Sequence, residues 1–155
     1  MDDATQAGTS KGALGLDTKV GDCAVYEAGG RRPGSVPWRT AGSVARETDG
    51  FVWIGLQQPT EEEIGLLAEE FDLPALAVED AVKAHQRPKL EVYGDVAFVV
   101  LKPVHYIDHD EIVEVAEIAL FLGDGFVVTV RHGNSDVLRQ VRQELDAGSP
   151  LLELG

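Results

Sequence analysis

Glu79 and Asp80 are two adjacent carboxylates in a segment that we expect to be helical. At 100° per residue, they project on the same side as Leu76 and Lys83 and away from the apolar face. Magnesium is a hard ion that keeps several waters and accepts one or two carboxylates, so such a pair suits it. Spacing alone equally permits an ordinary solvated ion pair between Glu79 and Lys83, which stand in the favourable i, i+4 order.

A second group combines histidines and acids, namely His105, Asp108, His109 and Asp110. Two histidines four residues apart can bind zinc from one face of a helix. Pro103 and the β-type pattern around the group place it instead in a connection between strands, where a solvated hairpin loop is the plainer interpretation. A soluble metal-dependent hydrolase using these four residues stays open as an alternative, and so does a protein-interaction module without any ion.

The helix that carries Glu79 and Asp80 has recognisable limits. Asp72 is a candidate N-cap and Pro74 suits the first helical position. Ala75, Val78 and Val82 share its predicted apolar face. Pro88 cannot continue the helix and biases the residue before it toward extended angles, so a strand should begin near Lys89.

The segment from Thr60 to Phe71 predicts the clearest helix. Thr60 and Glu63 form a capping box, and the apolar stripe that follows is Ile64, Leu67, Ala68 and Phe71. A weaker helix is expected from Trp38 to Glu47. A last helix should follow Asn134-Ser135, with Val137, Leu138, Val141 and Leu145 facing inward.

Several apolar runs predict strands. They cover residues 22–26 (a short edge strand), 51–56, 90–93, 96–101, 111–122 and 126–130. The run 96–101 is apolar throughout, which indicates burial on both faces, and Gly94-Asp95 and Asp124-Gly125 suit hairpin turns. Hairpins flanked by helices predict an α/β (α+β-like) fold, a three-layer α/β/α sandwich around a mixed, mainly antiparallel sheet.

Composition indicates one domain of 155 residues, with a flexible tail over 1–20 and the domain over 21–155. The single Cys23 excludes an internal disulfide, and no apolar run reaches the roughly 18 residues of a membrane helix. The start is polar and unlike a secretory signal, so we expect the chain as given to be soluble. The net charge of −14 disfavours nucleic acid and anionic lipid as partners and attracts cations.

Four segments follow one another between about Phe51 and Leu145. They are Trp53-Ile54-Gly55-Leu56, then Glu79-Asp80 with His85-Gln86-Arg87-Pro88-Lys89, then Tyr93-Gly94-Asp95, and finally the run from Ile118 to Arg131. This ordered series resembles the cytoplasmic domain of CorA-type magnesium transporters. One departure is Gly55, where that family commonly carries Asp or Asn. The family's Gly-Met-Asn signature is absent from these residues.

The resemblance implies an N-terminal fragment, cut before the stalk helix and membrane region, from the cytoplasmic side of the inner membrane. In CorA-type proteins the Asp matching Asp80 is a regulatory magnesium ligand, and the Glu matching Glu79 contributes to the same region. The partner carboxylate comes from the neighbouring subunit of a homopentamer. ZntB-like zinc transporters share the domain, so the transported ion stays open; neither relative implies catalysis.

Overall fold

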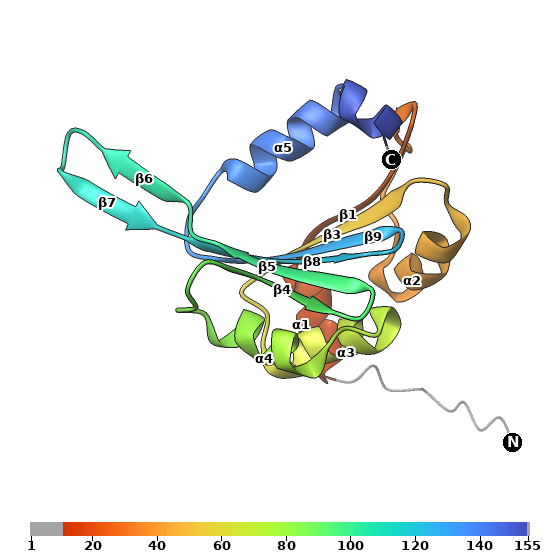
Figure 1. Ribbon diagram of the computed structural model, residues 1–155, viewed down its shortest axis with the longest axis horizontal. Helices are drawn as coiled ribbons and strands as arrows, with labels where there is room; N and C mark the ends of the chain where they lie inside the picture. The colour runs from red at the N-terminus through yellow and green to blue at the C-terminus, as the bar shows by residue number, and fades with distance from the viewer. Residues whose placement is uncertain (1–10, 155) are drawn as a thin grey trace, which may run out of the picture.

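The computed structural model describes residues 11–154, in which one twisted sheet has helices on both faces (Figure 1). The helices are α1 (Lys11–Lys19), α2 (Trp38–Glu47), α3 (Glu61–Phe71), α4 (Ala75–Lys83), α5 (Val137–Asp146) and the 3-10 helix η1 (Pro150–Leu154). The strands are β1 (Val20–Glu27), β2 (Gly30–Arg31), β3 (Phe51–Gln57), β4 (Lys89–Tyr93), β5 (Val96–Leu101), β6 (Val104–Ile107), β7 (Ile112–Val115), β8 (Glu117–Gly123) and β9 (Phe126–His132).

The main sheet has seven strands in the order β2-β1-β3-β9-β8-β5-β4. Within the described chain, β3 and β9 are parallel and the other neighbours in this sheet are antiparallel. Strands β6 and β7 form a separate hairpin that projects from the body (Figure 1). The predicted α/β sandwich around a mixed, mainly antiparallel sheet is therefore confirmed.

Helices α1 to α4 cover one face of the sheet and enclose the larger core. Ile64 and Leu67 of α3 are completely buried, as are Ile54 of β3 and Phe98 of β5. The capping box at the start of α3 is present as predicted, since the Glu63 amide donates to the Thr60 hydroxyl and the Thr60 amide to the Glu63 carboxylate. The apolar stripe of α3 thus holds this helical layer on the sheet.

The opposite face carries α5 and η1, which pack far less deeply. Leu138 and Leu145 of α5 pack only in part, against a small cluster of Ala24, Tyr26, Trp53 and Leu152. Val137 and Val141 are 43% and 41% exposed, so the prediction that they face inward is wrong. The reason is that α5 covers only the strands at one side of the sheet (Figure 1). The part of this face that α5 leaves uncovered includes the exposed side chains of Leu90, Val92 and Leu122.

Four other expectations need correction. Residues 11–19 form α1 with Leu16 fully buried against the core, so the proposed tail over 1–20 is wrong there; residues 1–10 lie outside the described chain. The long strand 111–122 divides at Ala116, whose amide bonds the Pro103 carbonyl, and its first part pairs with β6. The prediction that residues 96–101 are buried on both faces is wrong, because α5 does not reach β5 and its residues alternate between buried and partly exposed. The prediction of an edge strand over residues 22–26 is also wrong, since β1 has a neighbouring strand on each side.

Candidate metal-binding face on α4

The outward face of α4 is set by its short connection to α3. Asp72 adopts a left-handed conformation with φ 51° and ends α3, and Pro74 takes the N-cap position of α4. The prediction of Asp72 as an N-cap is therefore wrong. Helix α4 buries Ala77, Val78 and Ala81 and packs Val82 in part against the core, so of the predicted apolar face only Ala75 is exposed. This packing leaves Glu79 and Asp80 half-buried at the side of the helix.

A strained loop then returns the chain to the sheet. Ala84 and His85 have φ values of 56° and 59°, which non-glycine residues rarely adopt. The loop is held by Glu117 of β8, a carboxylate only 7% exposed, which accepts a 2.8 Å hydrogen bond from the Gln86 amide. Because this anchor fixes the loop, β4 begins beside α4, as the position of Pro88 predicts.

Lys89 at the start of β4 reaches back to the predicted site. Its ammonium nitrogen Nζ lies 2.6 Å from Oδ2 of Asp80 and 2.7 Å from Oε1 of Glu91. The hydrogen bonds that the ammonium donates to these two carboxylates, Asp80 foremost, raise the pKa of Lys89. The ammonium therefore stays charged at neutral pH and occupies one side of Asp80.

Glu79 forms the ion pair with Lys83 that the i, i+4 spacing predicts. That pair is exposed, with 45% of the Glu79 side chain and 62% of Lys83 open to solvent, so water screens it. Asp80 keeps 28% of its side chain exposed beside it. Leu76, one turn earlier on α4, is 65% exposed and extends the open surface.

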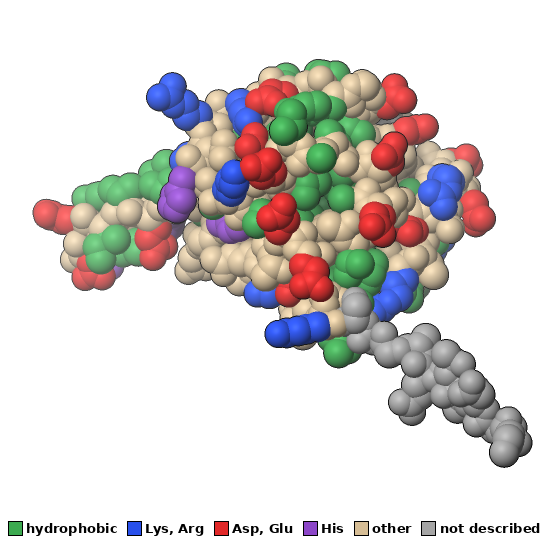
Figure 2. Space-filling view, turned by 90° about the horizontal axis from the view of Figure 1, so that it is seen from below, with side chains coloured by type: hydrophobic (Ala, Val, Ile, Leu, Met, Phe, Trp, Pro, Cys, Tyr) green, Lys and Arg blue, Asp and Glu red, His purple; other side chains and the backbone are tan. Residues whose placement is uncertain are grey.

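The donor set suits a hard ion. Glu79 and Asp80 offer oxygens alone, which are the ligands that magnesium prefers, and a hydrated ion needs no complete cage. In the part of the chain that the structure describes, no three His, Cys, Asp or Glu side chains meet closely enough to hold a metal. This helical face supplies half a site at most, and acidic side chains spread over it (Figure 2).

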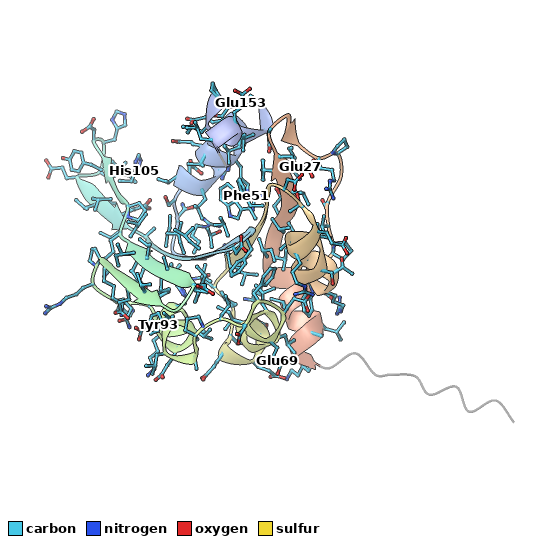
Figure 3. The ribbon with its side chains drawn as sticks, turned by 45° about the vertical axis from the view of Figure 1, so that its right-hand side comes forward. Glu27, Phe51, Glu69, Tyr93, His105 and Glu153 are labelled. Carbon is cyan, nitrogen blue, oxygen red and sulfur yellow. The ribbon has the colours of Figure 1, made fainter. Side chains whose placement is uncertain are left out.

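The His105 group lies on the β6–β7 hairpin, as the labelled His105 shows (Figure 3). His105 is paired across the hairpin with Glu114, while Asp108, His109 and Asp110 form the turn at the far end. The described residues contain no metal-holding cluster here either. The structure therefore matches the interpretation as a solvated hairpin.

A second polar cluster, which the sequence interpretation missed, ties α5 to the sheet. Arg142 of α5 donates to Asp22 of β1 at 2.8 Å and lies 4.0 Å above the Trp53 ring. Arg31 contacts the same Asp22 at 2.9 Å, and Tyr26 donates to Asp146 at 2.7 Å. Asp22 and Tyr26 lie on the same face of β1, but Arg142 and Asp146 are 120 positions away from them, so sequence spacing carries no signal of these two contacts.

Comparison with known proteins identifies the family. A model of the CorA-like Mg2+ transporter protein family matches residues 48–154. The chain belongs to this family. YfjQ of Bacillus subtilis (strain 168), named as a metal ion transporter, is 32% identical over 105 residues that make up 68% of this chain and 32% of that protein. This CorA-like chain thus spans about a third of the length of that relative.

Solved structures share the fold of this CorA-like domain. Full-length CmaX superposes with a TM-score of 0.67 at 18% identity over 84% of this chain and 40% of its own. The cytoplasmic domain of ZntB from Vibrio parahaemolyticus gives 0.61 at 12% identity over 84% of this chain and 51% of its own. Because both identities are low, these likenesses establish the fold and leave the ion open. Among residues 11–154, no helix is long and apolar enough to cross a membrane.

Proposed function

We propose that this chain is the cytoplasmic regulatory domain of a CorA-like magnesium transporter, in which Glu79 and Asp80 form part of a weak regulatory magnesium site between subunits. The observation that carries the proposal is the partly exposed placement of both carboxylates at the side of α4, beside the exposed Leu76, in a chain of this family. The domain then lies at the cytoplasmic face of the membrane and senses the ion.

The chemistry of such a site follows from its donors. Asp80 and Glu79 would hold a partly hydrated magnesium ion together with a carboxylate from a neighbouring copy. The ion would also offset the repulsion between domains that each carry a net charge of −14. Lys89 is an internal competitor, because its ammonium group must leave Asp80 before the ion can take that position.

Energetics favour several such sites acting together. At ten times its dissociation constant, a ligand stabilises the bound state by about 1.4 kcal/mol per site. Moving a two-state equilibrium from 1:99 to 99:1 needs about 5.5 kcal/mol. About four or five sites meet that requirement, which agrees with the homopentamer that we propose for the whole transporter. Bound magnesium would favour the closed state of the transporter, and loss of the ion would let the neighbouring domains separate.

The site is tested by magnesium titration of this chain, followed by backbone amide NMR shifts. We expect weak binding centred on α4 that Asp80→Asn abolishes. Asp95→Asn removes one charge from an exposed turn and should leave binding unchanged. Lys89→Gln should strengthen binding because it removes the competing ammonium. Shifts spread evenly over acidic surfaces, equal in both Asp variants, would contradict the proposal.

The assembly is tested on the complete transporter. Sedimentation velocity with and without magnesium should give a more compact particle with the ion, and Asp80→Asn should remove the difference. Identical sedimentation in both conditions would argue against regulation through this face. A ZntB-like zinc transporter is the second candidate, since the fold fits it equally; tighter binding of zinc than of magnesium at the same carboxylates would favour it.

A further inference from the structure

A cleft of about 260 Å³ lies between α5 and the sheet, on the opposite side of the sheet from α4. Its lining is Gly21, Asp22, Gly55, Leu56, Gln57, Thr129, Arg131, Ser135, Leu138, Arg139 and Arg142. Three arginines and a single acidic residue therefore line one small space. In a chain with a net charge of −14, this concentration of positive charge calls for an explanation.

The arginines differ in how far they are neutralised. Arg142 shares the Asp22 carboxylate with Arg31, and Arg31 also contacts Asp146 at 3.4 Å, so these two bases are compensated by two acids. Arg139 is paired with Asp136 at the rim and is 70% exposed. Arg131 forms no ion pair in residues 11–154, and its Nη1 makes only 3.4 Å contacts with two backbone carbonyls. Arg131 is thus the uncompensated cation of the cleft.

The floor of the cleft brings two polar groups together at Gly55. A Cβ atom at this position would lie only 3.2 Å from Nη2 of Arg142 and 3.6 Å from the Thr129 hydroxyl, so glycine lets these groups lie close to the strand. The buried Thr129 hydroxyl accepts a hydrogen bond from the Trp53 ring, which leaves its own proton available to an acceptor. Stacking on Trp53 fixes the plane of the Arg142 guanidinium.

We propose that this cleft binds a small phosphorylated anion, held chiefly by Arg131 and Arg142 with the Thr129 hydroxyl. Guanidinium groups match the oxygens of phosphate in paired hydrogen bonds, and a hydroxyl donor completes the set. A phosphate monoester carries a charge of about −1.5 to −2 at pH 7, enough to neutralise the unpaired guanidinium of Arg131 and to attract that of Arg142. The first turn of α5 adds the favourable end of a helix dipole at the cleft.

The ligand must be small. The strongly negative domain repels long polyanions such as nucleic acids, and the cleft holds little more than a phosphoryl group and its neighbouring atoms. The site is independent of the proposed magnesium site, because it shares no residue with α4. A negative result for phosphate binding therefore leaves the magnesium proposal untouched, and a negative result for magnesium binding leaves the phosphate proposal untouched.

The test is calorimetric titration of this chain with inorganic phosphate and with glycerol phosphate, at constant ionic strength set by sodium chloride. We expect saturable binding of both; equal affinity means that the phosphoryl group alone is recognised, and tighter binding of the ester means that the cleft also contacts its organic part. Arg131→Gln should weaken binding at least tenfold. Arg87→Gln removes the same charge from an exposed position outside the cleft and should have no effect.

Substitution at Gly55 gives the sharpest comparison. Gly55→Asp places a carboxylate against the Arg142 guanidinium and should abolish phosphate binding, while Gly55→Asn crowds the same atoms without a charge and should weaken binding less. Circular dichroism verifies the fold of each variant. No heat beyond that of chloride alone, equal losses in Arg131→Gln and Arg87→Gln, or undiminished binding in Gly55→Asp would each overturn the proposal.

Discussion

The face of the sheet under α1–α4 is covered by apolar side chains, whereas the opposite face meets α5 largely through arginines and carboxylates. On the first face, Leu67 and Phe98 belong to one continuous core and are fully buried. On the second, α5 has no buried residue among those described, and Arg142 with Asp22 links the helix to the sheet. The same sheet thus supports two kinds of attachment.

The difference assigns different roles to the two layers. Burial of apolar area is the main source of folding free energy, so the α1–α4 layer should supply most of the stability. Polar contacts contribute less net free energy, since each exchanges bonds with water for bonds within the protein. The α5 layer is therefore the part that a ligand or a neighbouring segment can reposition at lower cost.

The largest expected effect tests this contrast directly. Leu67→Ala removes a fully buried side chain and should lower the free energy of unfolding by about 2–5 kcal/mol. Leu138→Ala, in the half-buried part of α5, should cost about 1 kcal/mol. Urea denaturation followed by circular dichroism measures both. Equal losses would show that α5 is as firmly packed as α3.

A second prediction uses pH to sharpen the comparison. Burial, followed by the nearby charge of Asp22, raises the pKa of the Cys23 thiol from its ordinary 9.0 to about 11, and Cys23 faces the α1–α4 core. The folded state keeps this proton after the unfolded chain has lost it. Stability should therefore be unaffected below pH 9 and fall between pH 9 and 11, by up to about 1.4 kcal/mol per pH unit.

The measurement is urea denaturation across this pH range, with Cys23→Ala as the matched variant. The free energy of unfolding of Cys23→Ala should fall less steeply with pH than that of the natural chain. A remaining decline belongs in part to Tyr26, whose pKa is raised by burial and by the hydrogen bond to Asp146. Identical slopes in the two proteins would mean that water reaches Cys23 and that this core is less closed than described.

Local signals in the sequence predicted the fold well where neighbouring residues decide it. The capping box at Thr60, the limits of the helix Trp38–Glu47 and the turn after Gly123 are all present, because caps and turns depend on residues within one or two turns. The predictions that failed concern burial. Helical periodicity places Val141 on the apolar face of α5, but it cannot show that α5 covers only part of the sheet and leaves this side chain exposed.

The candidate sites show the same division. The outward placement of Glu79 and its pairing with Lys83 followed from helical spacing. The contact of Lys89 with Asp80 needs a loop held by Glu117, 31 positions from its partner Gln86, and no periodic pattern carries that information. Magnesium binding at Asp80 itself stays a prediction.

A smaller effect is expected at the start of α3. Thr60→Ala removes the side-chain acceptor for the Glu63 amide and should cost about 1 kcal/mol, in the range usual for helix N-caps. Thr40→Ala is the matched control, because the Thr40 hydroxyl contacts only the Pro37 carbonyl and is exposed. The urea concentrations at the midpoints of unfolding of the two variants measure this difference. If Thr40→Ala lowers the free energy of unfolding as much as Thr60→Ala does, the capping box does not stabilise α3 in the way proposed.

The smallest effect should come from an exposed pair on α5. Arg139 contacts Asp136 at 2.8 Å, yet both side chains are largely exposed, so water screens the attraction. A positive charge in the first turn also opposes the helix dipole, which offsets part of the remaining gain. Arg139→Ala should therefore change the free energy of unfolding by less than about 0.5 kcal/mol in the same urea experiment. A loss above about 1 kcal/mol would mean that surface charges, rather than the Arg142–Asp22 contact and the small apolar cluster, hold α5 on the sheet.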